Sequence, residues 1–234
     1  MPAPDPAPPL NPAARGGYDS CDVPASPRPT RRQFLGLLGL GLAGAAALAG
    51  APAPDRRLPQ EPWLFRDNDF DSLATMEQAH LPIVRLARPL LRRSPGPVLD
   101  LGAGNGALVD RICHEVPGCT PYGVELVPER ASHARALCPA HGDQIVAGDM
   151  FGCQDLFGRD YALVLLMPGR LLDGPAEGCA WLRERLRDRA RNLLVYAYDD
   201  WLERYGTLRH LAEAAGLRIA DHHPQARAAL ARLA

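Results

Sequence analysis

The chain has 234 residues and a formal net charge of −1 at pH 7, so no overall field recruits nucleic acid or a strongly acidic partner. Apart from histidine, its basic side chains are all arginine, which excludes Schiff-base chemistry on lysine and a phosphate loop that carries lysine. The six cysteines form no C-x-x-C pair and the histidines lack metal-ligand spacing, so no metal site is expected.

The first 29 residues are dominated by proline, alanine and other small residues. A segment of this composition buries too little apolar surface to offset the entropy lost when it is ordered. We therefore expect residues 1–29 to be a disordered tail.

A targeting pattern follows the tail. Residues 30–35 match the twin-arginine signal pattern, and an uncharged run of leucine, alanine and glycine extends from 34 to 51. We predict that residues 30–51 are a twin-arginine-type signal or membrane anchor. The twin-arginine translocase and the membrane are then expected partners, and the cell envelope is the expected location. Two alternatives stay open: an anchor that leaves the domain on the cytoplasmic face, and a start codon assigned too early.

Residues 52–69 return to proline and charge, and we expect a linker there. Asp67, Asp69 and Asp71 alternate as in a calcium loop, but the glycine and glutamate that such a loop needs at its sixth and twelfth positions are absent. A polar loop is the better interpretation, and with Phe65 and Phe70 it is a candidate lid over a bound ligand.

A helix is predicted next. Thr75 and Gln78 have the spacing of a capping box, and Pro82 and Pro89 should kink or split this helix before Arg93.

From residue 96 onward, short apolar runs alternate with helical patterns, as in βαβ units on a parallel sheet. The predicted strands are 98–101, 121–126, 144–147, 161–167, 192–198 and 217–222, and the predicted helices are 107–115, 128–137, 178–189 and 207–215. Residues 225–234 follow the sixth strand closely enough for a hairpin, so we predict a short antiparallel seventh strand, although their alanine and leucine also suit a helix. The predicted fold class is α/β: a doubly wound, mostly parallel Rossmann-like sheet in a single domain.

The chemistry concentrates after the first predicted strand, where Asp100-Leu-Gly102-Ala-Gly104-Asn-Gly106 runs directly into a helix. Glycines there permit a sharp turn and a close approach of a ligand to the backbone. The helix that follows directs its free N–H groups toward the same place. This stretch therefore predicts a ligand-binding loop.

Two cofactors compete for this loop. Gly102, Gly104 and Ala107 satisfy the dinucleotide pattern G-x-G-x-x-A, and Glu125 ends the second strand where a ribose-binding acid lies in that fold. An NAD-binding oxidoreductase is therefore one alternative.

Three features favour another cofactor. Asp100 precedes the first glycine by two residues, a third glycine stands at 106, and Gly148-Asp149-Met150 follows the third strand. These residues resemble the class I S-adenosylmethionine-dependent methyltransferases, in which an acid precedes G-x-G-x-G and further acids follow strands two and three. The resemblance covers residues 70–234 and implies a methyltransferase domain there, with S-adenosyl-L-methionine as the cofactor.

The resemblance also implies which residues hold the cofactor. Asp100 and the glycine loop would hold its methionine part, and Glu125 would accept from both ribose hydroxyls. Asp149 would accept from the adenine amino group, with the apolar side chains at 126 and 150 flanking the ring. The implied cofactor-binding residues are Asp100, Gly102, Ala103, Gly104, Gly106, Glu125, Leu126, Asp149 and Met150.

The methyl acceptor and the catalytic residues are not identified by the sequence. The fourth strand ends in Met167-Pro168-Gly169, without the motifs of families that methylate base or glutamine amino groups or cytosine C5, and without the aspartate of spermidine-synthase-like relatives. An apolar fourth strand ending in proline faintly resembles the lysine methyltransferases of the ATP synthase c-subunit. A protein lysine or a small molecule of the envelope is therefore the expected acceptor, and a noncatalytic cofactor-binding module is the alternative.

Overall fold

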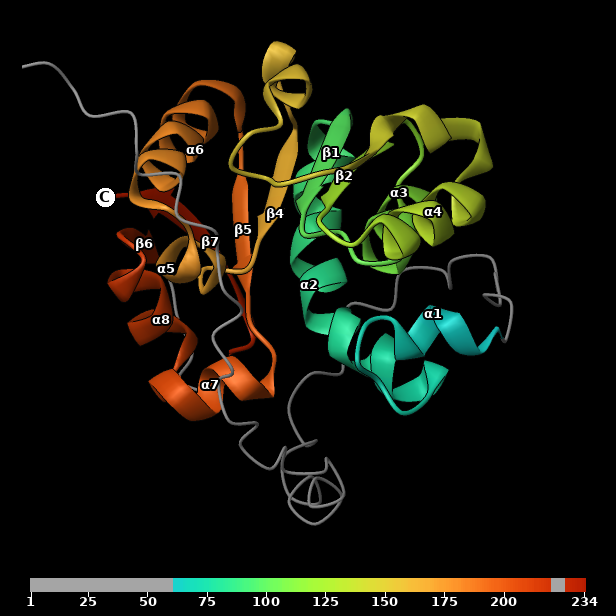
Figure 1. Cartoon of the computed structure of the whole chain (residues 1–234), viewed down its shortest axis with the longest axis horizontal. Coiled ribbons are helices and arrows are strands. Elements are labelled where there is room, and N and C mark those ends of the chain that lie inside the picture. Colours follow the sequence, from blue (N-terminus) through green and yellow to red (C-terminus); the bar gives the residue numbers. More distant parts are fainter. Residues whose placement is uncertain (1–60, 220–225) are drawn as a thin grey trace, which may run out of the picture. The chain divides into compact units, whose positions relative to one another are not determined.

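The computed structural model describes residues 61–219 and 226–234, and Ala53–Ala234 form one compact unit (Figure 1). The predicted tail, the twin-arginine-type signal and residues 52–60 of the linker lie outside the described residues. Within the described ranges, no helix combines the length and the apolar character that crossing a membrane requires.

The described residues form one seven-stranded sheet in the order β3-β2-β1-β4-β5-β7-β6. β1 to β5 pair in parallel, and β7 runs antiparallel between β5 and β6. This confirms the doubly wound, mostly parallel α/β sheet and the antiparallel seventh strand. The strands are β1 (Pro97–Leu101), β2 (Thr120–Glu125), β3 (Ile145–Ala147), β4 (Leu163–Leu166), β5 (Leu193–Tyr196), β6 (Leu217–Ile219) and β7 (Ala228–Leu233).

Helices cover both faces of the sheet (Figure 1). Leu99 and Leu101 of β1 belong to a core shared with α6 and α8, whereas Val98 belongs to a second core shared with α2 and α3. This alternation follows from the period of two along a strand. The α-helices are α1 (Pro62–Arg66), α2 (Leu73–Arg93), α3 (Ala107–Glu115), α4 (Pro128–Leu137), α5 (Arg170–Asp173), α6 (Ala176–Arg189), α7 (Asp199–Tyr205) and α8 (Leu208–Ala214); two 3₁₀ helices are η2 (Pro139–Gln144) and η3 (Gln154–Gly158).

The central strands place one charged residue deep in the sheet. β1 lies between β2 and β4, and Asp100 pairs in register with Gly123 on one side and Leu165 on the other. Strands that are buried on both faces usually carry continuous apolar runs. Asp100 breaks such a run and is only 1% exposed.

The start of α2 differs from the sequence prediction. The helix begins at Leu73 because Ser72 is the N-cap: its hydroxyl accepts from the Thr75 N–H, and the Thr75 hydroxyl accepts from the Ser72 N–H. The capping box is therefore one turn earlier than the predicted pair of Thr75 and Gln78.

The prolines of α2 also behave differently from the prediction, since they do not split the helix. Pro82 and Pro89 lie inside one continuous 21-residue helix. Pro89 is exposed, so water can satisfy the carbonyl group that loses its helical donor. Ile83 and Leu91 are buried against the sheet. Tertiary packing therefore outweighs the low helical propensity of proline.

Candidate functional site

The glycine loop connects β1 to α3 at the carboxyl end of the parallel strands. Gly104 and Gly106 have φ angles of +57° and +79°, in the left-handed region that favours glycine. Gly106 is also the N-cap of α3, and a Cβ atom there would lie 2.9 Å from the Cβ of Ala134 on α4. Gly106 therefore allows the amino end of α3 to lie close to α4, and the glycines leave the loop backbone without side chains that would block a ligand.

Glu125, the last residue of β2, fastens this loop. Its Oε2 accepts from the Gly104 N–H at 2.8 Å, and its Oε1 accepts from the Val127 N–H at 2.9 Å. The side chain is 7% exposed. Each carboxylate oxygen has room for a second donor, so Glu125 can hold a pair of hydroxyl groups while it anchors the loop.

Asp100 lies close to the Glu125 carboxylate, and one of its own carboxyl oxygens lacks a hydrogen-bond donor. Burial, and then the charge of Glu125, raises the pKa of Asp100 to about 7, while a hydrogen bond from Tyr196 opposes the shift. Its Oδ1 is buried and has no hydrogen-bond partner among the described residues. A buried carboxylate oxygen without a donor destabilises the folded protein, and a cation or hydrogen-bond donor placed there would relieve that cost.

The loop after β3 supplies the remaining predicted residues. Asp149 is exposed, and its Oδ1 accepts from the Phe151 N–H at 3.0 Å. The Cε of Met150 lies 3.6 Å from where a Cβ on Gly102 would be. On the neighbouring β2 loop, Leu126 is 70% exposed, which is unusual for so large an apolar side chain.

The structure thus brings the predicted residues to three adjacent strand ends, in the sheet order β3-β2-β1. Ala103 differs from the others, because its Cβ lies 2.9 Å from where a Cβ on Gly123 would be. Its side chain therefore packs on β2, and only its backbone faces a ligand. That these residues bind a cofactor stays a prediction.

A row of aromatic rings extends from Asp100 across the carboxyl end of β5, and its partnerships were not indicated by the sequence patterns. We call Tyr196, Tyr198, Phe70 and His80 the aromatic row. Successive ring centroids lie 5.5, 5.5 and 5.8 Å apart, all in edge-to-face geometry. Burial, with a smaller contribution from Arg111, lowers the pKa of His80 to about 3, so its imidazole is neutral. Tyr196, Phe70 and His80 are only 3%, 5% and 2% exposed, so the row is a largely buried cluster of rings rather than an open surface.

Asn105, a variable position of the glycine motif, is a second residue that the patterns did not indicate. It is 0% exposed. Its Nδ2 donates to the carbonyl oxygens of Trp63 and Leu64 at 3.0 and 2.5 Å, which attaches α1 to the loop. The only hint of this role in the sequence is that a polar residue stands between two glycines.

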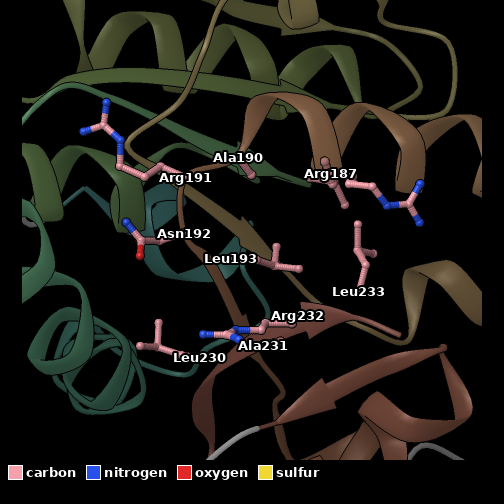
Figure 2. A pocket seen from close by; sticks show the side chains of 10 residues that line it. Arg187, Ala190, Arg191, Asn192, Leu193, Leu230, Ala231, Arg232 and Leu233 are labelled. Atoms are coloured by element: carbon pink, nitrogen blue, oxygen red, sulfur yellow. The ribbon is translucent and has the colours of Figure 1, made fainter.

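Other regions of the described structure give weaker indications of a ligand or metal site. A cavity of about 440 Å³ lies where β5 begins, at the opposite end of the parallel strands, and Figure 2 shows the guanidinium groups of Arg187 and Arg191 pointing away from each other there. Ligands in such sheets bind at the carboxyl ends of the strands. Within residues 61–219 and 226–234, no cluster of three or more histidine, cysteine, aspartate or glutamate side chains could hold a metal ion.

No protein-family model matches this sequence, and no curated protein matches it. Similar solved structures include Streptomyces venezuelae DesVI, with 14% identity and a TM-score of 0.50 over 73% of this chain and 94% of that chain. The mitomycin 7-O-methyltransferase MmcR shares 19% identity, with a TM-score of 0.47 over 69% of this chain. CalS10, an amino pentose methyltransferase from Micromonospora echinaspora solved with SAM bound, shares 21% identity, with a TM-score of 0.42 over 53% of this chain.

The chain spans 56% of the length of MmcR and 51% of that of CalS10. At these identities the likeness concerns the fold alone, and it agrees with the mostly parallel seven-stranded sheet described above.

Proposed function

We propose that this chain is an S-adenosylmethionine-dependent methyltransferase. The observation that carries the proposal is the buried Asp100, whose Oδ1 has no partner within the described ranges and lies in the strand that leads into the glycine loop. The cofactor has an ammonium group and a sulfonium centre, and both favour an ionised carboxylate nearby. The methyltransferases among the similar folds support the same cofactor.

The residues present fit the cofactor in the roles that the resemblance implies. Asp100 and the N–H groups of the glycine loop would hold its methionine part, and Glu125 has free acceptor capacity for the two ribose hydroxyls. Asp149 would accept from the adenine amino group, beside the exposed Leu126. When bound, the cofactor supplies an electrophilic methyl group. The protein's part is to hold donor and acceptor in line and to exclude water.

The strand order argues against the nicotinamide alternative. Common dinucleotide-binding sheets have the order 3-2-1-4-5-6. Here an antiparallel β7 lies between β5 and β6. The glycine pattern alone does not separate the two cofactors, whereas this added strand favours the methyltransferase proposal.

Calorimetric titration tests the cofactor. We expect S-adenosylmethionine and S-adenosylhomocysteine to bind the purified protein and NAD⁺ to give no heat of binding. Binding of NAD⁺ without a response to either adenosyl ligand would overturn the proposal.

The acceptor requires a second experiment, since a noncatalytic module would also bind the cofactor. Labelled methyl groups are offered to a cell-envelope fraction and to a soluble fraction, and mass spectrometry identifies the product. Transfer to a protein lysine or to a small molecule of the envelope distinguishes the two expected acceptors. Transfer to neither fraction would favour the binding module.

The targeting proposal rests on the sequence of residues 30–35, which lie outside the described part of the chain. We propose export or envelope tethering through the twin-arginine route. Residues 1–55 are fused to a reporter that is active only after export in the folded state. Export that stops when Arg31 and Arg32 are replaced by lysine supports the route, and a signal indifferent to that change contradicts it.

A further inference from the structure

Asn105 is saturated by bonds within the protein. Its Nδ2 uses both hydrogens on the carbonyl groups of Trp63 and Leu64. Its Oδ1 accepts from the Ala107 N–H at 3.2 Å and from Asn68 Nδ2 at 2.7 Å. A side-chain amide has two donors and two acceptor sites, so Asn105 has no capacity left for a ligand. Its role is to hold the segment of α1 and the turn after it, residues 62–70, which we call the lid segment.

Asn68 is the residue of the lid segment that lies directly over the glycine loop. A Cβ atom on Gly104 would lie 2.1 Å from Asn68 Oδ1, so the missing side chain of Gly104 makes room for this amide. The same Gly104 donates its N–H to Glu125. A molecule that Glu125 and the loop hold together therefore passes beside Asn68.

Asn68 Oδ1 also has acceptor capacity to spare. Its described partner is the Asn105 N–H at 3.4 Å, near the upper limit of a hydrogen bond. A carbonyl oxygen accepts two hydrogen bonds, and Asn68 is only partly buried. The atom is thus available to a donor that reaches the loop.

A second attachment fixes the lid segment at α4. Asp67 Oδ2 lies 2.5 Å from His133 Nδ1, and the Trp63 ring stacks on the His133 ring with a centroid distance of 4.6 Å. Figure 1 shows α1 beside the first turns of α2. The position of Asn68 over Gly104 is therefore imposed from two sides, by the glycine loop and by α4.

We infer that Asn68 is a further contact residue for the ligand of the glycine loop, and that Asn105 is the residue that positions it. Asn68 Oδ1 accepts a hydrogen bond from an ammonium or hydroxyl group of that ligand. The identity of the ligand rests on the proposed function, but the attachment of the lid segment by Asn105 does not.

The first experiment measures amide hydrogen exchange in the protein without ligand. Asn105→Ala should speed exchange in residues 62–70, because it removes the bonds to Trp63 and Leu64. Asn105→Asp is the isosteric variant: it keeps the acceptor for the Ala107 N–H but places an oxygen against the two carbonyl groups, so it should speed exchange as well. The matched control is Asn192→Ala, which removes a 2.9 Å bond to the Ala162 carbonyl at the other end of the sheet. Equal exchange in the lid segment of wild type and both Asn105 variants would overturn the positioning role.

The second experiment titrates S-adenosylhomocysteine. Asn68→Ala should weaken binding about tenfold, the effect of one hydrogen bond, and Asn105→Ala should do the same. The double variant should bind within about twofold of either single variant, because both changes remove the same contact. Independent structural damage would instead multiply the two losses to about a hundredfold, which contradicts the inference.

Other outcomes are equally decisive. If Asn68→Ala binds S-adenosylhomocysteine as tightly as wild type or more tightly, Asn68 covers the loop without contacting the ligand, and the inference fails. If the wild-type protein binds no adenosyl ligand, the proposed function fails, while hydrogen exchange still decides the role of Asn105.

Discussion

The two halves of the carboxyl edge of the sheet carry different chemical groups: backbone N–H groups and carboxylates in the first half, and aromatic rings in the second. The ends of β1, β2 and β3 and the loops after them present backbone N–H groups and the carboxylates of Asp100, Glu125 and Asp149. The region beyond β5 presents the aromatic row, in which rings from three separate segments touch edge to face. Hydrogen bonds to a backbone can fix the geometry of a ligand, whereas Tyr196, Phe70 and His80 of the aromatic row are buried and pack on one another. We therefore expect mutations in the first half to weaken ligand binding, and mutations in the aromatic row to act mainly on packing.

The largest effect is expected from Gly104→Val, which should abolish binding of S-adenosylhomocysteine. A β-branched side chain at φ +57° is strained, and its Cβ would meet Asn68 Oδ1 at 2.1 Å. The control is Gly118→Val, which imposes similar strain at φ +85° in a turn against Pro95. It should lower the melting temperature but leave binding intact. Retained binding by Gly104→Val would mean that the ligand does not use this loop.

A smaller loss is expected from Glu125→Ala, about 2–4 kcal/mol of binding free energy or roughly 30- to 1,000-fold in affinity. The variant removes the proposed acceptor for the ribose hydroxyls and releases the Gly104 N–H. Titration of Glu129→Ala, an exposed acid in the first turn of α4, supplies the control and should match wild type. Equal affinities for both variants and wild type would place the site elsewhere.

The stability of the folded protein should depend on pH through Asp100, which lies in the first half of this edge. Its carboxyl keeps its proton in the folded protein up to about pH 7 but loses it near pH 4 when unfolded, so its contribution to stability is lost as pH rises toward 7. Asp100→Asn should therefore raise the melting temperature, and the difference from wild type should grow between pH 5 and 8. A gap that shrinks over this range would contradict the raised pKa.

The same carboxyl should make cofactor affinity depend on pH. A cation favours the ionised form, so binding of S-adenosylmethionine to wild type should weaken by about tenfold between pH 7.5 and 6, more steeply than in Asp100→Asn. Parallel pH profiles for the two proteins would remove Asp100 from the site.

Asp149→Ala should cost less than tenfold in affinity. The side chain is exposed, and a hydrogen bond in water contributes less than a buried one. Binding of adenosine analogues without the exocyclic amino group checks the assignment, because the variant should no longer distinguish them from adenosine. Continued discrimination would assign adenine recognition to another residue.

The smallest effect on cofactor binding is expected from Tyr198→Leu, within about twofold for S-adenosylhomocysteine, since the change lies in the aromatic row, where it removes edge-to-face ring contacts. A loss of affinity comparable to that of Glu125→Ala would show that both halves contribute to binding of S-adenosylhomocysteine.

The positions of the groups in the first half could be predicted from the sequence because each lies within a few residues of a strand end: Glu125 is the last residue of β2, and the glycines follow β1. The contacts of Asn105 could not, since Trp63 lies 42 residues away and no local pattern links them. The ring contacts of the aromatic row could not be predicted either, because its rings come from segments that are far apart in the sequence. Nor could the short helices α5 and α7 be predicted, because neither has a side-chain N-cap, whereas α8, which is as short as α7, begins after Thr207, whose side chain accepts from the His210 N–H.

The prolines of α2 have a consequence for the order of folding. A segment with prolines at two interior positions has little tendency to nucleate a helix by itself. Ile83, Val84, Ala87 and Leu91 find their apolar surroundings only against strands that are already paired. We therefore expect α2 to become helical as it docks on the assembling sheet, so that its first turns, and the lid segment beside them, reach their places late.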